Sequence, residues 1–473
     1  MLLAIDQGTT GTTCLVVDEA LAICGRGYRE LTQHFPAPGL VEHDAEEIWE
    51  TVLAAAEAAL ADAGVDVGEL HAIGIANQRE TTVLWDRATG RPVAPALVWQ
   101  DRRTAARCAE LPFDLIRERT GLVPDPYFSA TKLEWLLAHT GATGNLAFGT
   151  VDSWLAWKLT GEHVTDVSNA SRTMLLSLGE LAWDDELLAL FSVPRSVLPE
   201  VVSSSGKLGE ATLLGSTMPL TGLAGDQQAA LFGQACIVPG RAKVTYGTGA
   251  FVLANAGSAR PQPRPGVLAT VAWRLGDEPA VYALEGSVFV AGAAIQWLRD
   301  GLGLIEDAAA TEALARSLSG NDGVHFVPAL TGLGSPHWEP KARGLISGLT
   351  RGTRREHLVR AALEAIAFQT QDVLAAMNLD VELLRADGGA AANGFLLQFQ
   401  ADVSRLPVEV PVEREATALG AAALAALGAG TWTDTSELER RWRRAARYEP
   451  ELDVAEAEQL VAGWHVAVRR TLA

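Results

Sequence analysis

The stretch LLAIDQGTTGTTCLVVD, residues 2–18, places two apolar segments on either side of a turn rich in glycine and threonine. Apolar, β-branched segments that flank turn residues are typical of strands, so we expect a strand, the turn GTTG at residues 8–11, and a second strand. A third strand is expected in LAICGRGYREL, residues 21–31. The segments follow one another too closely for intervening helices. This first sheet is therefore predicted to be partly antiparallel.

The same pattern recurs halfway along the chain. RAKVTYGTGAFVLAN, residues 241–255, again reads as strand, Gly-Thr turn and strand. A chain of 473 residues is also longer than one ordinary core supports. Internal similarity of this kind predicts two related domains that face each other. We place the boundary near IVPG, residues 237–240, which gives domains at residues 1–236 and 237–473, with an error of ten residues or more.

A helix is predicted after the opening strands. Asp44 is a good N-cap, Glu47 three residues later completes a capping-box pattern, and Gly64 follows the last residue of an apolar stripe with helical spacing. HAIGIAN at residues 71–77 and TVLWD at residues 82–86 then read as strands. This alternation predicts an α/β domain with a mixed sheet.

Bulk composition narrows the possible partners. The net charge of −20 argues against a nucleic-acid or anionic-membrane surface, because both attract basic patches. The four cysteines are scattered without close pairs, which favours a reducing, cytoplasmic compartment. The opening residues do not resemble a secretion signal. The apolar run at residues 416–430 is short for a membrane span and contains glycines, so we expect a closely packed helix rather than membrane insertion.

The glycine-threonine turn is a candidate phosphate site. The P-loop pattern GxxxxGK followed by serine or threonine does not occur in the sequence. A turn made of Gly8, Thr9, Thr10 and Gly11 can instead present backbone N–H groups and hydroxyls to a phosphate. Asp6 at the end of the preceding strand could reach Mg²⁺ directly or through water. The alternative is an ordinary hairpin with a solvated aspartate.

A second candidate for nucleotide contact is ADGGAAANGF, residues 386–395. Consecutive glycines between an apolar strand and a helix start allow a backbone to approach a flat ring or a phosphate closely. Gly388, Gly389 and Asn393 are the expected contacts. A plain strand-to-helix turn is the alternative.

Two pairs of polar residues follow predicted strands, Arg79 with Glu80 and Asp226 with Gln227, and the segments ALVWQDRRT and DPYF add the aromatic residues Trp99 and Tyr127. Such a set suits a neutral polyol, because polar groups bind the hydroxyls and rings cover the C–H faces. A polyol hydroxyl is a poor nucleophile, so phosphoryl transfer needs a carboxylate that accepts its proton. Asp226 and Glu80 are both candidates for this base. The alternative for Arg79 and Glu80 is a surface salt bridge.

Nearly the whole chain resembles the FGGY family of carbohydrate kinases. The resemblance is carried by AIDQGTT, PGLVEHDAEEIW, GIANQRETTVLWD, VWQDRRTA, GLVPDPYFSATK, DSWLAWKLTG, TDVSNASRTML, GLAGDQQAALFGQ, TYGTGAF, ALEGSVFVAGAAIQWLRD, GLGSPHW and DGGAAANGFLLQFQ. It implies two actin-like (ribonuclease H-like) α/β domains with mixed sheets and a catalytic cleft between them. The branch it resembles most implies ATP-dependent phosphorylation of glycerol to sn-glycerol 3-phosphate, with Mg²⁺.

The resemblance also implies roles for individual residues. The implied glycerol contacts are Arg79, Glu80, Trp99, Tyr127, Asp226, Gln227 and Phe251, with Asp226 as the general base and Glu80 as a hydroxyl-binding partner of Arg79. The implied nucleotide contacts are Thr9, Thr10, Gly11, Thr248, Gly292, Gln296, Gly389 and Asn393, with Asp6 near the metal.

Three departures from the family pattern are visible. Thr13 stands where many members carry an arginine beyond the first phosphate turn, which bears on ATP affinity rather than on the reaction. The loop at residues 213–218 lacks both the stretch that binds fructose 1,6-bisphosphate and the histidine that is phosphorylated in some relatives, so neither regulation is expected.

The rival functions are a kinase for another polyol or ketose and a non-catalytic actin-like ATP sensor. A homo-oligomer, dimer or tetramer, is expected from the family.

Overall fold

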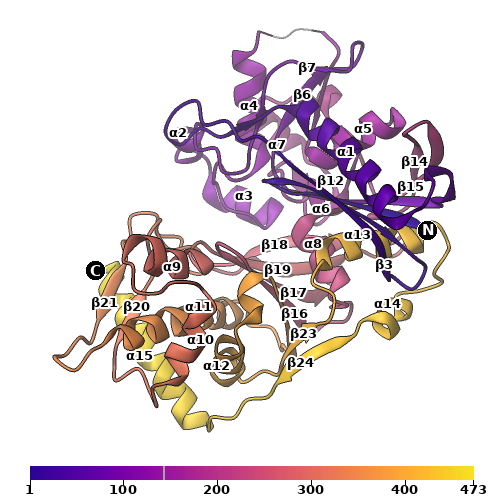
Figure 1. The fold of residues 1–473 in the computed structure, drawn as a ribbon. Helices are drawn as coiled ribbons and strands as arrows, with labels where there is room; N and C mark the ends of the chain where they lie inside the picture. Colours follow the sequence, from indigo (N-terminus) through magenta and orange to yellow (C-terminus); the bar gives the residue numbers. More distant parts are fainter. Residues whose placement is uncertain (142–143) are drawn as a thin grey trace.

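The computed structural model describes residues 1–141 and 144–473. Two large mixed sheets, each covered by helices, divide the molecule into two α/β halves, and Figure 1 shows the first half in indigo to purple above the second in pink to yellow. This arrangement confirms the predicted fold class of two α/β domains with mixed sheets.

The first sheet has the order β14-β15-β5-β1-β2-β3. Its strands are β1 (Leu2–Gln7), β2 (Gly11–Val17), β3 (Ile23–Glu30), β5 (Ala72–Asn77), β14 (Ser205–Leu213) and β15 (Ser216–Gly225). β1 pairs antiparallel with β2 and parallel with β5, and β2 pairs antiparallel with β3. The three opening strands and the mixed sheet predicted from the sequence are confirmed.

The second sheet has the order β18-β19-β17-β16-β22-β23-β24. Its strands are β16 (Arg241–Tyr246), β17 (Ala250–Gly257), β18 (Leu268–Trp273), β19 (Val281–Val288), β22 (Leu383–Asp387), β23 (Val408–Pro411) and β24 (Arg444–Tyr448). β16 pairs antiparallel with β17 and parallel with β22, and β17 pairs antiparallel with β19. The run β22-β16-β17-β19 thus repeats the pairing of β5-β1-β2-β3. The similarity of the two hairpin sequences reflects two halves of like topology.

Helix α1 (Ala45–Ala63) begins and ends where the sequence predicts. The Asp44 side chain accepts a hydrogen bond from the Glu46 N–H, and Gly64 closes the helix with a φ of 66°. The predicted capping box is wrong, because the Glu47 carboxylate instead accepts from the backbone N–H of Thr32, 3.0 Å away. Thr32 follows β3. The Glu47 carboxylate is therefore hydrogen-bonded to a residue outside its own helix, and not to the backbone N–H at the start of α1 as the local pattern predicted.

Helices α8 (Asp226–Gly233) and α13 (Ala416–Gly428) pack against each other beside the first sheet. A Cβ added at Gly420 would lie 1.9 Å from the Ala229 carbonyl oxygen, so the two backbones touch only because this residue is glycine. This confirms the closely packed helix expected at residues 416–430. α13 also contacts β15, β5 and β1, although in sequence it lies between β23 and β24 of the second sheet. The domain boundary at residues 236–237 stays a prediction. No helix in the part of the chain that the structure describes is long and apolar enough to cross a membrane.

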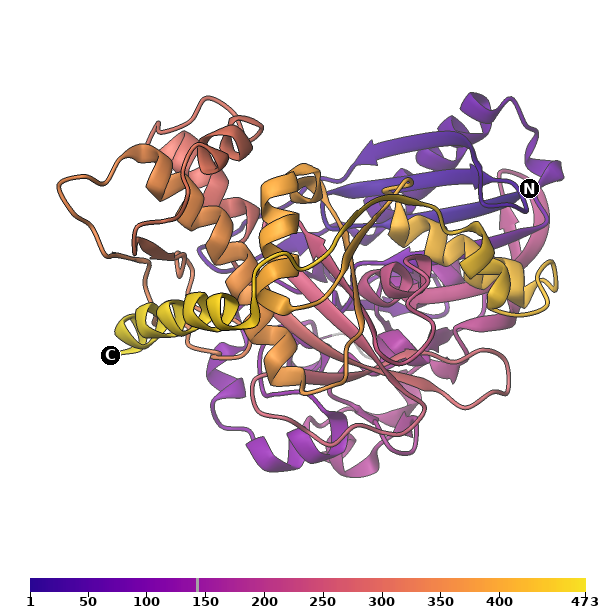
Figure 2. The same ribbon diagram turned by 90° about the horizontal axis from the view of Figure 1, so that it is seen from below.

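The remaining elements surround these two sheets, and the two chain ends lie at opposite ends of the molecule (Figure 2). The other helices are α2 (Ala105–Cys108), α3 (Phe113–Thr120), α4 (Ser129–His139), α5 (Val151–Thr160), α6 (Val167–Ala170), α7 (Asp185–Leu190), α9 (Gly292–Gln296), α10 (Ala310–Arg316), α11 (Arg355–Met377), α12 (Gly394–Ser404), α14 (Ser436–Arg441) and α15 (Val454–Leu472). Short strands are β4 (Glu42–His43), β6 (Val83–Asp86), β7 (Arg91–Pro92), β8 (Ala96–Leu97), β9 (Leu146–Gly149), β10 (Val164–Asp166), β11 (Leu176–Ser177), β12 (Ala182–Trp183), β13 (Glu200–Val202), β20 (His325–Val327) and β21 (Leu345–Ser347).

Candidate active site

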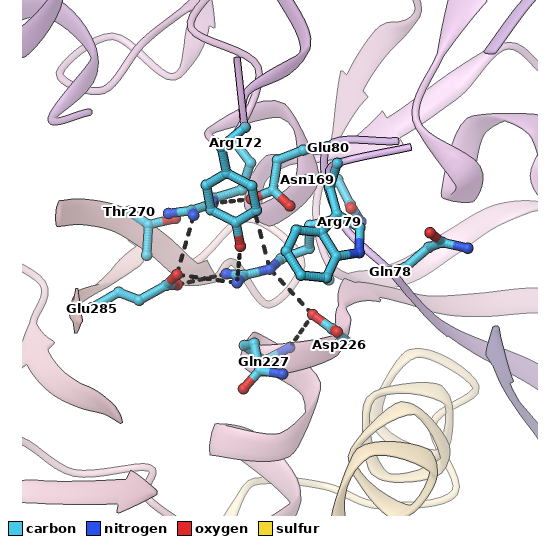
Figure 3. A network of polar contacts seen from close by, with 12 residues as sticks. Gln78, Arg79, Glu80, Asn169, Arg172, Asp226, Gln227, Thr270 and Glu285 are labelled. Atoms are coloured by element: carbon cyan, nitrogen blue, oxygen red, sulfur yellow. Dashed lines mark hydrogen bonds and ion pairs between the residues drawn. The ribbon is translucent and has the colours of Figure 1, made fainter. Parts of the chain in front are cut away.

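Arg79 and Asp226 meet at the carboxyl ends of two neighbouring strands. β5 and β15 run parallel and end level, with Asn77 opposite Gly225. Arg79 lies two residues beyond β5, and Asp226 is the first residue of α8, directly after β15. The Arg79 Nε lies 3.1 Å from the Asp226 Oδ1 (Figure 3). The topology of the first sheet therefore brings together two residues that are 147 positions apart in sequence.

Arg79 lies at the centre of a buried network of polar contacts. Its side chain is 2% exposed, its Nη1 lies 2.5 Å from Glu285 Oε2, and its Nη2 donates to the Tyr127 hydroxyl at 3.3 Å. Glu80 Oε1 is 3.9 Å from the Arg79 Nε. The alternative of a surface salt bridge between Arg79 and Glu80 is wrong, because both side chains are buried.

The two candidate bases lie in different environments. The Asp226 side chain is 29% exposed, whereas that of Glu80 is 1% exposed and holds an ion pair of 2.6 Å with Arg172. Burial raises the pKa of Glu80, and the charges of Arg79 and Arg172 oppose this rise. Glu80 also has a φ of 62°, a strained backbone conformation for a residue with a side chain. Of the two carboxylates, that of Asp226 is therefore the accessible one.

Arg172 and Glu285 belong to the network but were not among the predicted site residues. Arg172 bridges Glu80 and Glu285, with its Nη2 3.1 Å from Glu285 Oε1. Burial alone would raise the pKa of Glu285, but Arg172 and Arg79 outweigh it and lower the pKa to about 2. Glu285 lies on β19 of the second sheet, so these ion pairs join the two halves. A glutamate inside the apolar strand VYALEGSV was the signal that could have identified it.

Aromatic side chains line the same region. The rings of Trp99 and Tyr127 meet edge to face, with centroids 5.5 Å apart. The Trp99 Nε1 donates a hydrogen bond of 2.9 Å to the Thr9 hydroxyl, which connects these rings to the first glycine-threonine turn. Phe251 on β17 lies opposite Ser287 on β19. Two residues farther along β17, Leu253 lies opposite Glu285. Because directly opposed residues and residues two apart share a face, Phe251 and Glu285 face the same side of the second sheet.

In each glycine-threonine turn the N–H of the first glycine donates to a carbonyl of the same turn, three residues on in the first turn and two residues on in the second. The Gly8 N–H donates to the Gly11 carbonyl at 2.9 Å, and the Gly247 N–H donates to the Gly249 carbonyl at 2.8 Å. In the described chain, the N–H groups of Thr9, Thr10 and Thr248 donate to no protein acceptor, whereas their carbonyls accept bonds from neighbouring segments. Unpaired N–H groups of adjacent turn residues are suited to bind an anion such as phosphate.

Gly11 and Gly292 are required by close backbone contacts around these turns. A Cβ at Gly11 would lie 2.5 Å from the Arg29 carbonyl oxygen, and one at Gly292 would lie 2.6 Å from the Gly247 carbonyl oxygen. The Gly292 N–H donates to the same Gly247 carbonyl at 3.0 Å, so the start of α9 is attached to the second turn. The structure thus brings Gly292 and Thr248 together.

The strand-to-helix turn after β22 lies against the second hairpin. Gly388 has a φ of 86°, and a Cβ there would lie 2.4 Å from the Tyr246 carbonyl oxygen. The neighbouring Gly389 is exposed, and a Cβ at that position would meet no atom of the described chain within 4 Å. The Asn393 side chain caps α12 by accepting from the Leu396 N–H, and it donates to the Thr311 hydroxyl. Gln296 lies exposed at the end of α9, without a side-chain hydrogen bond to the rest of the described chain.

The surroundings of Asp6 disfavour the charged form of its carboxylate. Its carboxylate accepts no hydrogen bond from the described residues, and burial together with the charges of Asp226 and Glu415 raises its pKa to about 8. A hard cation would relieve this repulsion, and Mg²⁺ needs few carboxylates because water and phosphate oxygens complete its shell. Within residues 1–141 and 144–473, no group of three or more His, Cys, Asp or Glu side chains could hold a metal. Thr13 lies opposite Asp6 on β2.

The raised pKa of Asp6 predicts a pH-dependent gain in stability for Asp6→Asn. Between the unfolded pKa of 3.8 and the folded pKa of about 8, the folded chain binds more protons than the unfolded chain, so Asp6 makes stability fall as pH rises. Asparagine does not titrate. The stability of Asp6→Asn relative to the unchanged chain should therefore increase from pH 5 to pH 8, by up to about 1.4 kcal/mol per pH unit.

Urea denaturation at several pH values without Mg²⁺ measures this difference. Asp185→Asn is the matched control, because the Asp185 side chain is 86% exposed. A difference between Asp6→Asn and the unchanged chain that stays constant from pH 5 to pH 8 would show that Asp6 is ionised throughout.

Comparison with known proteins gives one consistent result. Residues 1–233 match the N-terminal domain, and residues 242–429 the C-terminal domain, of the FGGY family of carbohydrate kinases. A glycerol kinase of Dechloromonas aromatica is 54% identical over 100% of this chain and 97% of its own length. Glycerol kinase 2 of Thermotoga maritima is 51% identical over 100% of this chain and 98% of its own length. The crystal structure of Plasmodium falciparum glycerol kinase with ADP superimposes with a TM-score of 0.94 at 35% identity, covering 100% of this chain and 98% of that one.

Proposed function

The chain belongs to the FGGY family of carbohydrate kinases, and from this premise we propose that it transfers the γ-phosphoryl group of ATP to glycerol, giving ADP and sn-glycerol 3-phosphate. The observation that carries the proposal is the pairing of the partly exposed Asp226 carboxylate with the buried Arg79 guanidinium. This pair supplies a base that a small hydroxyl compound can reach. The glycerol kinases compared above support glycerol as that compound.

Asp226 is the general base of the proposed reaction. Its carboxylate accepts the proton of the attacking hydroxyl as the oxygen bonds to the γ-phosphorus. Arg79 and the Gln227 N–H, which donates to Asp226 Oδ1 at 2.7 Å, fix the carboxylate before substrate binds. Such preorganisation avoids a reorientation cost at the moment of reaction.

The remaining substrate contacts surround this carboxylate. Arg79, Glu80 and Gln227 supply polar groups for the other hydroxyls, while Trp99, Tyr127 and Phe251 cover the carbon backbone. The rings of Trp99 and Tyr127 are already in contact in the structure, which supports a small pocket and favours glycerol over a longer ketose. A non-catalytic ATP sensor would not need an accessible carboxylate in this position.

On the nucleotide side, the free N–H groups of Thr9, Thr10 and Thr248 bind phosphate oxygens, with Gly11 and Gly292 allowing close approach. Gln296, Gly389 and Asn393 contact the nucleoside. Asp6 would hold Mg²⁺, which neutralises charge on the transferred phosphoryl group. Because Thr13 cannot replace a guanidinium, the backbone N–H groups carry more of the phosphate binding.

The proposal includes a cytoplasmic location and a homo-oligomeric state. The four cysteines, Cys14, Cys24, Cys108 and Cys236, are all free thiols, which supports a reducing compartment where ATP is available. The oligomer is proposed as a dimer or tetramer, in line with the family.

An ADP-release assay across a panel of polyols tests the function. We expect ATP turnover that depends strongly on glycerol and is much slower with a five-carbon ketose such as xylulose. Analysis of the product by ³¹P NMR distinguishes phosphorylation at a primary carbon from simple ATP hydrolysis. Equal turnover with glycerol and xylulose would contradict the substrate assignment, and turnover without any polyol would contradict the kinase assignment.

A further inference from the structure

Lys243 is a fully buried lysine that the proposed mechanism does not use. It lies on β16, where Ala242, Val244 and Tyr246 point into the core of the second half. Residues alternate along a strand, so Lys243 and Thr245 point to the opposite face. That face contacts α8, which begins with Asp226. A buried cation at the junction of the two halves needs a specific explanation, because burial of a charge is costly unless the charge is well paired.

The Lys243 ammonium has two hydrogen-bond partners and neither is a carboxylate. Its Nζ donates to Gln227 Oε1 and, at 2.9 Å, to the Thr245 hydroxyl. The charges of Asp387 and Asp226 act on it, but in the described chain neither carboxylate forms an ion pair or a hydrogen bond with it. An ammonium has only donors, and even the neutral amine has two N–H groups, which is enough for both bonds. The bond to Gln227 therefore fixes which end of that side-chain amide faces Lys243.

The orientation of the Gln227 amide determines what it offers to the cleft. Because the Oε1 atom faces Lys243, the NH₂ group points away from it, and no protein acceptor in residues 1–141 or 144–473 takes a bond from that group. Gln227 is only partly buried, so its NH₂ group is open to a ligand. An amide free to rotate by 180° would offer a donor or an acceptor in the same place. With Lys243 in position, it offers only a donor.

We propose that Lys243 is a positioning residue that fixes Gln227 as a hydrogen-bond donor and thereby makes the site require a hydroxyl oxygen at that place in the substrate. The inference rests on the proposed function and deepens it, since it concerns how glycerol is distinguished from diols. A site that dedicates a partly buried donor to a hydroxyl rejects an analogue without that hydroxyl, because the donor is then left unpaired. β16 continues from Lys243 to the second glycine-threonine turn, so the substrate donor is held by the nucleotide half.

Lys243→Met tests the proposal with glycerol, 1,2-propanediol and 1,3-propanediol, each diol lacking one hydroxyl. We expect kcat/KM for glycerol to fall about tenfold, the usual effect of one lost hydrogen bond in a site. The diol that lacks the hydroxyl bound by Gln227 should lose little, so the preference for glycerol over that diol shrinks by about the same factor. KM for ATP should stay unchanged. A uniform loss with all three substrates would overturn the proposal.

A double-mutant cycle separates positioning from a general effect on packing. If Lys243 acts through Gln227, then Lys243→Met adds little to Gln227→Ala, whereas independent effects multiply. Multiplying effects would overturn the proposal.

If Lys243→Met does not fold, as judged by circular dichroism, Thr245→Val replaces it, because this isosteric change removes the second hydrogen-bond acceptor of the Lys243 ammonium. It should reduce the preference for glycerol about threefold, and an unchanged preference would overturn the proposal. Absence of glycerol turnover in the unchanged chain would instead refute the proposed function.

Discussion

Asp226→Asn is expected to lower kcat with glycerol by about 10²–10⁴-fold, the usual range for loss of a general base. The amide has nearly the same shape as the carboxylate but cannot accept a proton at neutral pH. Asp226 is the first residue of α8, its side chain is 29% exposed, and Arg79 holds it at 3.1 Å. The chemical step should therefore fail while KM for ATP changes little. Single-turnover phosphorylation with a saturating concentration of each substrate measures this step.

Two controls make the result with Asp226→Asn specific. Asp185→Asn changes a carboxylate whose side chain is 86% exposed and should leave kcat unchanged. Glu80→Gln changes the other candidate base, and it should act mainly on KM for glycerol because Arg172 already occupies that carboxylate. A near-normal kcat for Asp226→Asn would remove Asp226 from the role of base. A larger loss of kcat in Glu80→Gln would transfer the role to Glu80.

Local patterns predicted most of the fold because local physics decides those elements. The hairpins at residues 2–17 and 241–257 follow from apolar segments around glycine-threonine turns, and α1 follows from the Asp44 cap and the Gly64 stop. Local sequence patterns were insufficient to predict a side chain's hydrogen bonds where a tertiary contact competes with a local one. Glu47 leaves the predicted capping box because the Thr32 N–H takes its carboxylate in the folded chain.

The candidate site was predictable only in part for the same reason. Arg79 and Asp226 follow strands and could be identified one at a time, but their contact depends on β5 and β15 being neighbours. Residue chemistry alone also could not separate Asp226 from Glu80 as the base. The structure gives a physical difference between them, since one carboxylate is accessible and the other is buried against Arg172. Glu285 comes from the second sheet, 206 residues after Arg79, and only folding places it there.

Arg172→Met should destabilise the folded chain by about 3–5 kcal/mol, the usual cost of removing one partner from a buried ion pair. The Arg172 side chain is 0% exposed and pairs with Glu80 at 2.6 Å and with Glu285 at 3.1 Å. Its guanidinium also lies over the Tyr127 and Phe128 rings. Methionine fills much of the same volume but supplies neither charge nor donors, so Glu80 loses its nearest cation. Urea denaturation measures the loss.

The pH dependence of that loss identifies its cause. Without Arg172, burial raises the folded pKa of Glu80 further, so the folded chain keeps a proton there that the unfolded chain releases as pH rises. The deficit of Arg172→Met should therefore grow with pH and shrink in acid. Arg299→Met, which breaks an exposed pair with Asp300, should cost about 0–1 kcal/mol at any pH. Adding Glu80→Gln to Arg172→Met removes the carboxylate that has lost its closest ion pair and should recover part of the stability. A deficit that is no larger than that of Arg299→Met, or that Glu80→Gln does not reduce, would show that the ion pairs of Arg172 contribute little to the stability of the fold.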